Sequence, residues 1–198
     1  MKQIDYALAR CMMQPGDLMA FGGNGFISSV IKLRTQCNVS HVGAILQTNV
    51  PTVEGMNINQ VIESTSLDDG FAGVTINRMS THIEKYDGEI WWLPLGEAAR
   101  TRFKPGIFFG FMLDQVGKPY DAPQAILSAI DYLPDNRENL DKLFCSELVT
   151  AAYEKSGLIG ETNASEMTPA DVCRFDIYSQ VFQLKGEEKE LFPSGFAL

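Results

Sequence analysis

The sequence predicts an α+β fold in one domain, and three observations support this prediction. The chain has 198 residues, about the length of a single domain, and no internal repeat or long linker divides it. Short apolar runs typical of strands fill the first half, whereas apolar residues recur at helical spacing after Arg102. The composition, 45% hydrophobic and 21% charged, is that of a globular protein and excludes a disordered or collagen-like chain. We therefore expect residues 1–198 to form one domain.

The first half is expected to be mostly β. After the turn at Pro15-Gly16-Asp17, strands are predicted at 18–21, 40–46, 60–65, 73–77 and 90–94, with a helix at 26–33. The glycines at positions 22, 23 and 25 are expected to end the first strand. Strands 40–46 and 60–65 are expected to pair as a hairpin with a loop of roughly a dozen residues.

The second half is expected to be helical. Apolar residues at helical spacing predict a helix from 103 to 116, with Pro105 near its first turn, and a further helix at 122–133. The clearest helix begins at Phe144-Cys145 and ends before Gly157, which suits the C′ position.

Charge and composition exclude several classes of function. The net charge of −9 and the pI near 4.7 disfavour binding to nucleic acid and binding to an anionic membrane surface. No apolar run is suited to cross a bilayer and the N-terminal residues do not form a signal peptide, so we expect a cytoplasmic protein without an integral membrane segment. No cofactor is expected, because Gly22-Gly23-Asn24-Gly25 lacks the spacing of a phosphate-binding loop. Two histidines without CxxC or HExxH pairing likewise predict no metal site.

Cys145 is the candidate nucleophile. The four cysteines are too scattered for a disulfide framework, so free thiols are expected. Cys145 begins a predicted helix, where backbone N–H groups and the helix dipole favour a thiolate. A buried small hydrophobe is the alternative interpretation of Cys145, and position alone does not decide between the two.

A nucleophilic thiol needs a base and a group that orients the base. His41 is preferred to His82 because it lies in a strand of small and apolar residues, whereas His82 lies in a polar stretch typical of a solvated loop or helix. Glu63 is the candidate orienting group, because it lies on the strand expected to pair with that of His41. A structural histidine and an exposed strand carboxylate are the alternatives.

Several short motifs together resemble a known family. Gly117-Lys118-Pro119-Tyr120 and Cys145-Ser146-Glu147-Leu148-Val149 resemble the G-x-P-Y and D-C-S-x-L-V blocks of NlpC/P60 cysteine peptidases. Ser40-His41-Val42-Gly43 precedes the cysteine, which resembles the circularly permuted branch that includes the YiiX-like hydrolases and the lecithin:retinol acyltransferase-like proteins. Pro15-Gly16-Asp17-Leu18, Val61-Ile62-Glu63-Ser64 and Thr168-Pro169-Ala170-Asp171-Val172 resemble further blocks of this branch.

The resemblance implies a papain-like fold, with an antiparallel sheet or small barrel packed against the nucleophile-bearing helix. It also implies roles: Cys145 as nucleophile, His41 as general base and later acid, Glu63 as the group that orients His41, and Tyr120 as a contributor to oxyanion stabilisation. A packed turn tyrosine is the alternative for Tyr120. The chain departs from the NlpC/P60 pattern at Phe144, which replaces an aspartate, and in the long segment between Tyr120 and Cys145.

Three functions follow from these observations. The first is a cysteine peptidase or amidase that forms a thioester acyl-enzyme. The second is a thiol-dependent acyltransferase or lipid-ester hydrolase, and the third is a non-catalytic binding domain. The expected partner is a peptide, amide or acyl-lipid substrate, and the sequence leaves the oligomeric state open.

Overall fold

The computed structural model describes residues 1–66, 71–119 and 144–193, which form an α+β structure around a mixed sheet. The strands are β1 (Lys2–Gln3), β2 (Leu18–Gly23), β3 (His41–Pro51), β4 (Asn57–Ser66), β5 (Ala72–Arg78), β6 (Gly88–Leu93) and β7 (Phe182–Lys185). The helices are α1 (Tyr6–Ala9), α2 (Phe26–Thr35), α3 (Met79–Lys85), α4 (Glu97–Arg102), α5 (Pro105–Gln115), α7 (Cys145–Lys155), α8 (Pro169–Cys173) and the 3₁₀ turn η1 (Ala164–Glu166).

The sheet has the strand order β1-β7-β6-β2-β3-β4-β5. Every pair is antiparallel except β1 with β7, which is parallel, so the expectation of a purely antiparallel sheet is wrong at this edge. Within the described residues the order runs from β1 to β5 without closing, so the small-barrel alternative is also wrong. The short β1 and β7 lack the length that makes an alternating pattern readable in sequence.

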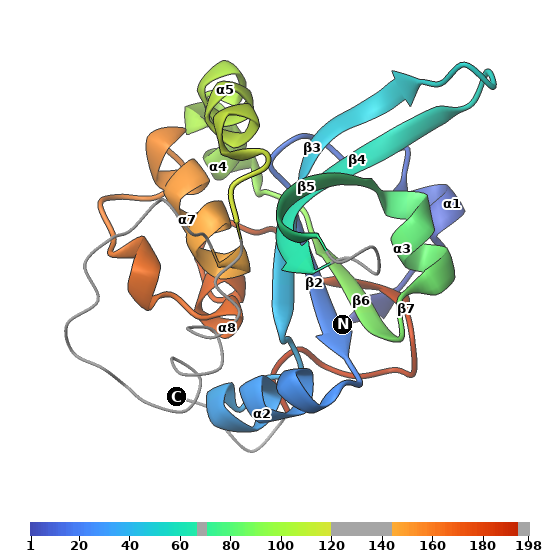
Figure 1. Cartoon of the computed structure of the whole chain (residues 1–198), viewed down its shortest axis with the longest axis vertical. Helices are drawn as coiled ribbons and strands as arrows, with labels where there is room; N and C mark the ends of the chain where they lie inside the picture. Colours follow the sequence, from blue (N-terminus) through green and yellow to red (C-terminus); the bar gives the residue numbers. More distant parts are fainter. Residues whose placement is uncertain (67–70, 120–143, 194–198) are drawn as a thin grey trace.

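The sheet separates two apolar clusters. Helices α4, α5, α7 and α8 cover one face, and α1 and α3 cover the other (Figure 1). Alternation along β2 feeds both clusters: Leu18 and Ala20 belong to the larger one, on the α7 side, while Met19 and Phe21 belong to the smaller one, on the α3 side. Side chains on both faces of β2 are therefore fully buried.

Most predicted elements are present, with longer strands than expected. The strands at 18–21, 40–46, 60–65, 73–77 and 90–94 correspond to β2, β3, β4, β5 and β6, and the helices at 26–33, 103–116 and 144–156 to α2, α5 and α7. The predicted helix at 122–133 lies outside the described residues.

Two boundary predictions are wrong. Gly22 and Gly23 do not end β2, because both pair with β6, opposite Glu89 and Gly88. Gly22 instead allows the backbone of Asn38 to approach β2 closely, since a Cβ at position 22 would lie 2.5 Å from the Asn38 carbonyl oxygen. The β3–β4 loop is also shorter than expected, because β3 runs to Pro51 and β4 begins at Asn57, with register shifts between Ile45 and Val50.

Candidate active site

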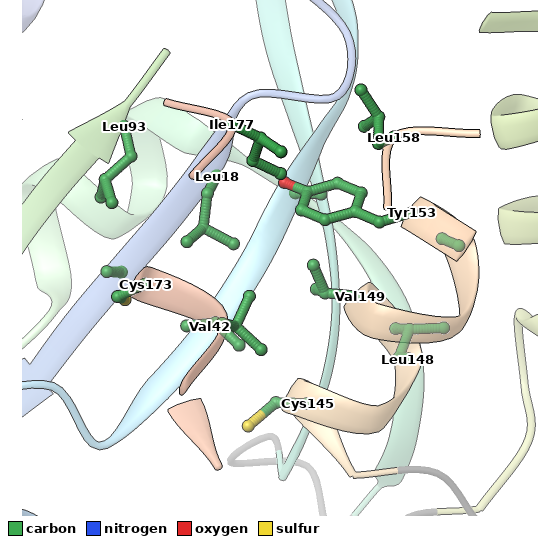
Figure 2. Close-up of a cluster of buried hydrophobic side chains, with 14 of the residues drawn as sticks. Leu18, Val42, Leu93, Cys145, Leu148, Val149, Tyr153, Leu158, Cys173 and Ile177 are labelled. Atoms are coloured by element: carbon green, nitrogen blue, oxygen red, sulfur yellow. The ribbon is translucent and has the colours of Figure 1, made fainter. Parts of the chain in front are cut away.

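Cys145 is the first residue of α7, and the chain places it there through a well-defined helix start. Phe144 is the N-cap in extended conformation, and the Glu147 carboxylate accepts a hydrogen bond from the Phe144 N–H at 3.4 Å. At the other end Gly157 has φ +78°, which confirms its predicted C′ position. The thiol lies at the end of the cluster of apolar side chains that α7 packs against β2 and β3 (Figure 2). Cys145 is buried, with 6% of its surface exposed.

His41 is the first residue of β3 and comes from the other side of the sheet. It is paired with Phe21 of β2, whose side chain belongs to the cluster on the α3 side, and the two rings lie 5.4 Å apart. Its neighbour Val42 faces the α7 side and belongs to the same cluster as Cys145. His41 and Cys145 interact through a side-chain hydrogen bond, so the two side chains meet where β3 begins.

Glu63 of β4 completes the line from the thiol. Its Oε2 lies 2.7 Å from Nε2 of His41, which leaves Nδ1 of the ring for the thiol. The β3–β4 register pairs Ala44 with Ile62, and one residue further it sets Gly43 opposite Glu63. A Cβ at Gly43 would lie 3.1 Å from the Cβ of Glu63. The missing side chain therefore lets the Glu63 carboxylate extend across β3 to His41.

The Glu63 carboxylate is buried, and both of its oxygens are bonded. Besides His41 on Oε2, His82 Nε2 lies 2.6 Å from Oε1, and the Asn77 side-chain amide donates to the same oxygen at 2.8 Å. Only 1% of the Glu63 side chain is exposed. Burial would raise the pKa of this carboxyl group, but the hydrogen bonds from His41 and His82 hold the pKa below its usual range. Glu63 is therefore a carboxylate at neutral pH.

The thiol and the imidazole perturb each other as an ion pair. Burial raises the pKa of Cys145, but the charge and hydrogen bond of His41, together with backbone hydrogen bonds from Val42 and Ser146, bring the pKa below its usual value. Burial lowers the pKa of His41, but Cys145 and then Glu63 outweigh it and raise the pKa to about 10. Each group therefore stabilises the charged form of the other, and the thiolate is the form that a sulfur nucleophile needs.

Three of the four predicted site residues are thus brought together: Cys145, His41 and Glu63. Tyr120, the fourth, lies outside the described residues. The prediction that Glu63 faces the side chain of His41 on the neighbouring strand agrees with the geometry, and the alternative of an exposed strand carboxylate is wrong.

The description of His82 as a solvated residue is wrong. Its side chain is 19% exposed and bonds to Glu63. Met79, His82, Ile83 and Tyr86 recur at the spacing of one helix face, and the three apolar or aromatic members pack in or against the smaller cluster. This stripe is the signal that could have identified His82 as an inward-facing residue.

The remaining cysteines lie apart from this chemistry. Cys37 and Cys173 are buried and Cys11 is exposed. Burial is the main reason that the pKa values of Cys37 and Cys173 are raised, which makes their thiols poor nucleophiles. Among residues 1–66, 71–119 and 144–193, no group of three or more His, Cys, Asp or Glu side chains is arranged to hold a metal ion. No helix of that part of the chain has the length and apolarity to cross a membrane.

Comparisons with known proteins give a structural likeness. No protein-family model matches the chain, and no curated protein matches its sequence. The chain is similar to the crystal structure of the metalloprotein YiiX from Escherichia coli O157:H7, with 18% sequence identity and a TM-score of 0.47. The match covers 72% of this chain and 66% of that one.

Proposed function

We propose that the chain is a cysteine hydrolase that cleaves an amide or peptide bond through a thioester acyl-enzyme. The single observation that carries this proposal is the line from Cys145 through His41 to a buried Glu63 carboxylate, 2.7 Å from the imidazole. A thiol, an imidazole and an orienting carboxylate are the components of nucleophilic acyl transfer. The order of the motifs supports the same chemistry through the resemblance to permuted NlpC/P60 enzymes.

In acylation, the Cys145 thiolate attacks the carbonyl carbon of the substrate and the carbonyl π electrons move to oxygen. The backbone N–H of Cys145, at the start of α7, is suited to stabilise that oxyanion. The C–N bond then breaks, and the His41 imidazolium gives its proton to the leaving amine. The products of this half-reaction are a free amine, a neutral His41 and a thioester on Cys145.

In deacylation, neutral His41 removes a proton from water as the water oxygen attacks the thioester carbonyl. The C–S bond breaks, and the carboxylic acid leaves while the thiolate re-forms beside a protonated His41. Throughout the cycle Glu63 accepts the Nε2–H hydrogen bond, which keeps Nδ1 directed to the reacting atoms and stabilises the imidazolium.

The proposal is tested by the pH dependence of iodoacetamide alkylation, with the modified cysteine identified by peptide mass. Cys145 is expected to react rapidly at about pH 6–7, below the pKa of a free thiol near 8.5. Exposed Cys11 is the internal reference for an accessible thiol. His41→Ala should remove the low-pH reactivity of Cys145. Equal reactivity of Cys145 and Cys11 at every pH would contradict the proposal and favour a binding domain.

A second measurement defines the acyl chemistry. Incubation with peptide amides, and separately with acyl esters, followed by acid quench should leave a mass increase on Cys145 equal to the acyl group. Hydroxylamine should release it, because thioesters are cleaved under conditions that leave amides intact. Transfer of the acyl group to an added amine or alcohol, rather than to water, would identify an acyltransferase instead of a hydrolase. Cys145→Ala is the control.

A further inference from the structure

We propose that His82 is a positioning residue of this site: its Nε2–H holds one oxygen of Glu63 so that the other oxygen is directed at His41. This inference rests on the proposed function, because the role concerns the line Cys145–His41–Glu63. It extends that line to a fourth member supplied by α3, an element that the motif resemblance does not include.

The two carboxylate oxygens of Glu63 have different hydrogen-bond partners. Oε2 lies 2.7 Å from Nε2 of His41, and Oε1 lies 2.6 Å from Nε2 of His82. The Asn77 amide also donates to Oε1, at 2.8 Å. A carboxylate whose oxygens are bonded on opposite sides cannot rotate about its last torsion without breaking a hydrogen bond. Because the group is buried, a broken bond leaves a charged oxygen unsatisfied, which is costly.

Helix α3 is anchored so that His82 is held in place. Met79 is fully buried, and Ile83 and Tyr86 pack against the same cluster. The ring of Phe21 lies 5.2 Å from that of His82 and 5.4 Å from that of His41. One aromatic side chain therefore contacts both imidazoles and fixes the spacing between them.

His41 and His82 both bond to Glu63, but their other contacts differ. His41 also interacts with Cys145. The ring of His82 instead lies beside those of Phe21, 5.2 Å away, and Tyr86, 6.4 Å away. The titratable groups around His82 are Glu63 from β4, His41 from β3 across that carboxylate, and Tyr86, the C-cap residue of α3. His82 acts on the thiol only through Glu63, which makes it a positioning residue rather than a catalytic one.

The test compares two variants of similar size, His82→Gln and His82→Leu. Glutamine keeps an N–H donor at a reach similar to Nε2, whereas leucine fills the space without a donor. With leucine, Glu63 is expected to lose its orientation, which weakens the bond to His41 and raises the pKa of Cys145. At a pH well below the midpoint of the profile of the unmodified protein, alkylation of Cys145 should then fall by about tenfold, the change in thiolate fraction that accompanies a shift of one pKa unit there. Glutamine should restore most of the rate.

Other outcomes have defined meanings. If His82→Leu lowers the melting temperature but leaves the midpoint of the pH–alkylation profile unchanged, His82 is only structural and the inference is wrong. A shift of the midpoint to lower pH also overturns it, because His82 would then compete with His41 for Glu63. If leucine prevents folding, His82→Asn replaces it, since its amide is too short to reach Oε1. Absence of low-pH reactivity in the unmodified protein contradicts the proposed function itself and is distinguishable from these results.

Discussion

Two buried carboxylates, Asp17 and Glu63, perform different tasks. Glu63 receives its hydrogen bonds mainly from imidazoles, so its charge can influence the reactivity of a thiol. Asp17 receives hydrogen bonds from the Trp92 indole at 3.0 Å and the Leu95 N–H at 2.9 Å, and it forms an ion pair with Arg100. These partners belong to β6, to the segment after it and to α4. Asp17 therefore ties the start of β2 to three other parts of the chain.

Replacing Asp17 should destabilise the fold strongly. Asp17→Ala leaves the Trp92 indole N–H and the Leu95 N–H without their acceptor. It also removes the ion-pair partner of the Arg100 guanidinium, which keeps its hydrogen bond to the Pro15 carbonyl. The expected loss in the free energy of unfolding is about 3–5 kcal/mol, the usual cost of breaking a buried ion pair. Urea unfolding followed by far-UV circular dichroism measures it. The control is Asp87→Ala, which removes an exposed contact with Asn24 and should change stability by less than about 1 kcal/mol.

At the scale of elements, the site depends on how closely β3 and β4 approach each other. Gly43 sets that approach, because a Cβ would lie 2.9 Å from a methyl group of Val61, 3.0 Å from the Ile62 carbonyl oxygen and 3.1 Å from the Cβ of Glu63. None of these neighbours is the free end of a flexible side chain. A methyl group at this position must separate the strands or displace Glu63.

Gly43→Ala is therefore expected to damage the site without removing any of its reactive groups. The overpacking should cost about 1–3 kcal/mol of stability. The pH needed for half-maximal alkylation of Cys145 should also increase, because Glu63 moves away from His41. Gly160→Ala is the matched control, since nothing lies within 4 Å of a Cβ at that position. An alkylation profile of Gly43→Ala that coincides with that of the unmodified protein would show that strand spacing does not control the site.

The elements that carry Cys145, His41 and Glu63 could be predicted from sequence because their signals are local. Strand alternation identified the hairpin, and apolar spacing with Gly157 identified α7. For His82, the spacing of Met79, Ile83 and Tyr86 indicates an inward-facing side chain, but no local pattern encodes its contact with Glu63 of β4. The parallel pairing of β1 with β7 was missed for a related reason: it joins Lys2 to Phe182, and two short strands give no periodicity.

On the scale of the whole molecule, the buried charges make stability depend on pH. Glu63 has its pKa lowered in the folded state by its histidine partners. A lowered acid pKa adds stability above the unfolded value, near 4.3, and that stability is lost as the pH falls through this region. His41 has the opposite sign: its folded pKa is raised to about 10, so its contribution is complete below about pH 6.5 and is lost as the pH rises toward 10.

Glu63→Gln should flatten the acid limb of this dependence. Between pH 7 and pH 3 the unmodified protein is expected to lose more unfolding free energy than Glu63→Gln, by on the order of 2 kcal/mol. In this pH range the carboxylate of Glu63 takes up a proton when the chain unfolds, and a glutamine does not. Urea titrations of both proteins at the two pH values measure the difference. Equal losses would mean that Glu63 is not held as a carboxylate in the folded protein.

The order of β3, β4 and α7 along the chain determines when the Cys145 thiol can become reactive during biosynthesis. The ribosome completes the hairpin that carries His41 and Glu63 before it adds Cys145. The acidity of this thiol comes from His41 and from backbone groups at Val42 and Ser146, so a nascent chain carries an ordinary, weakly reactive cysteine. Nucleophilic strength arises only when the helix docks on the finished sheet. Under the proposed function, the chain therefore has no strong sulfur nucleophile at this position before it has folded.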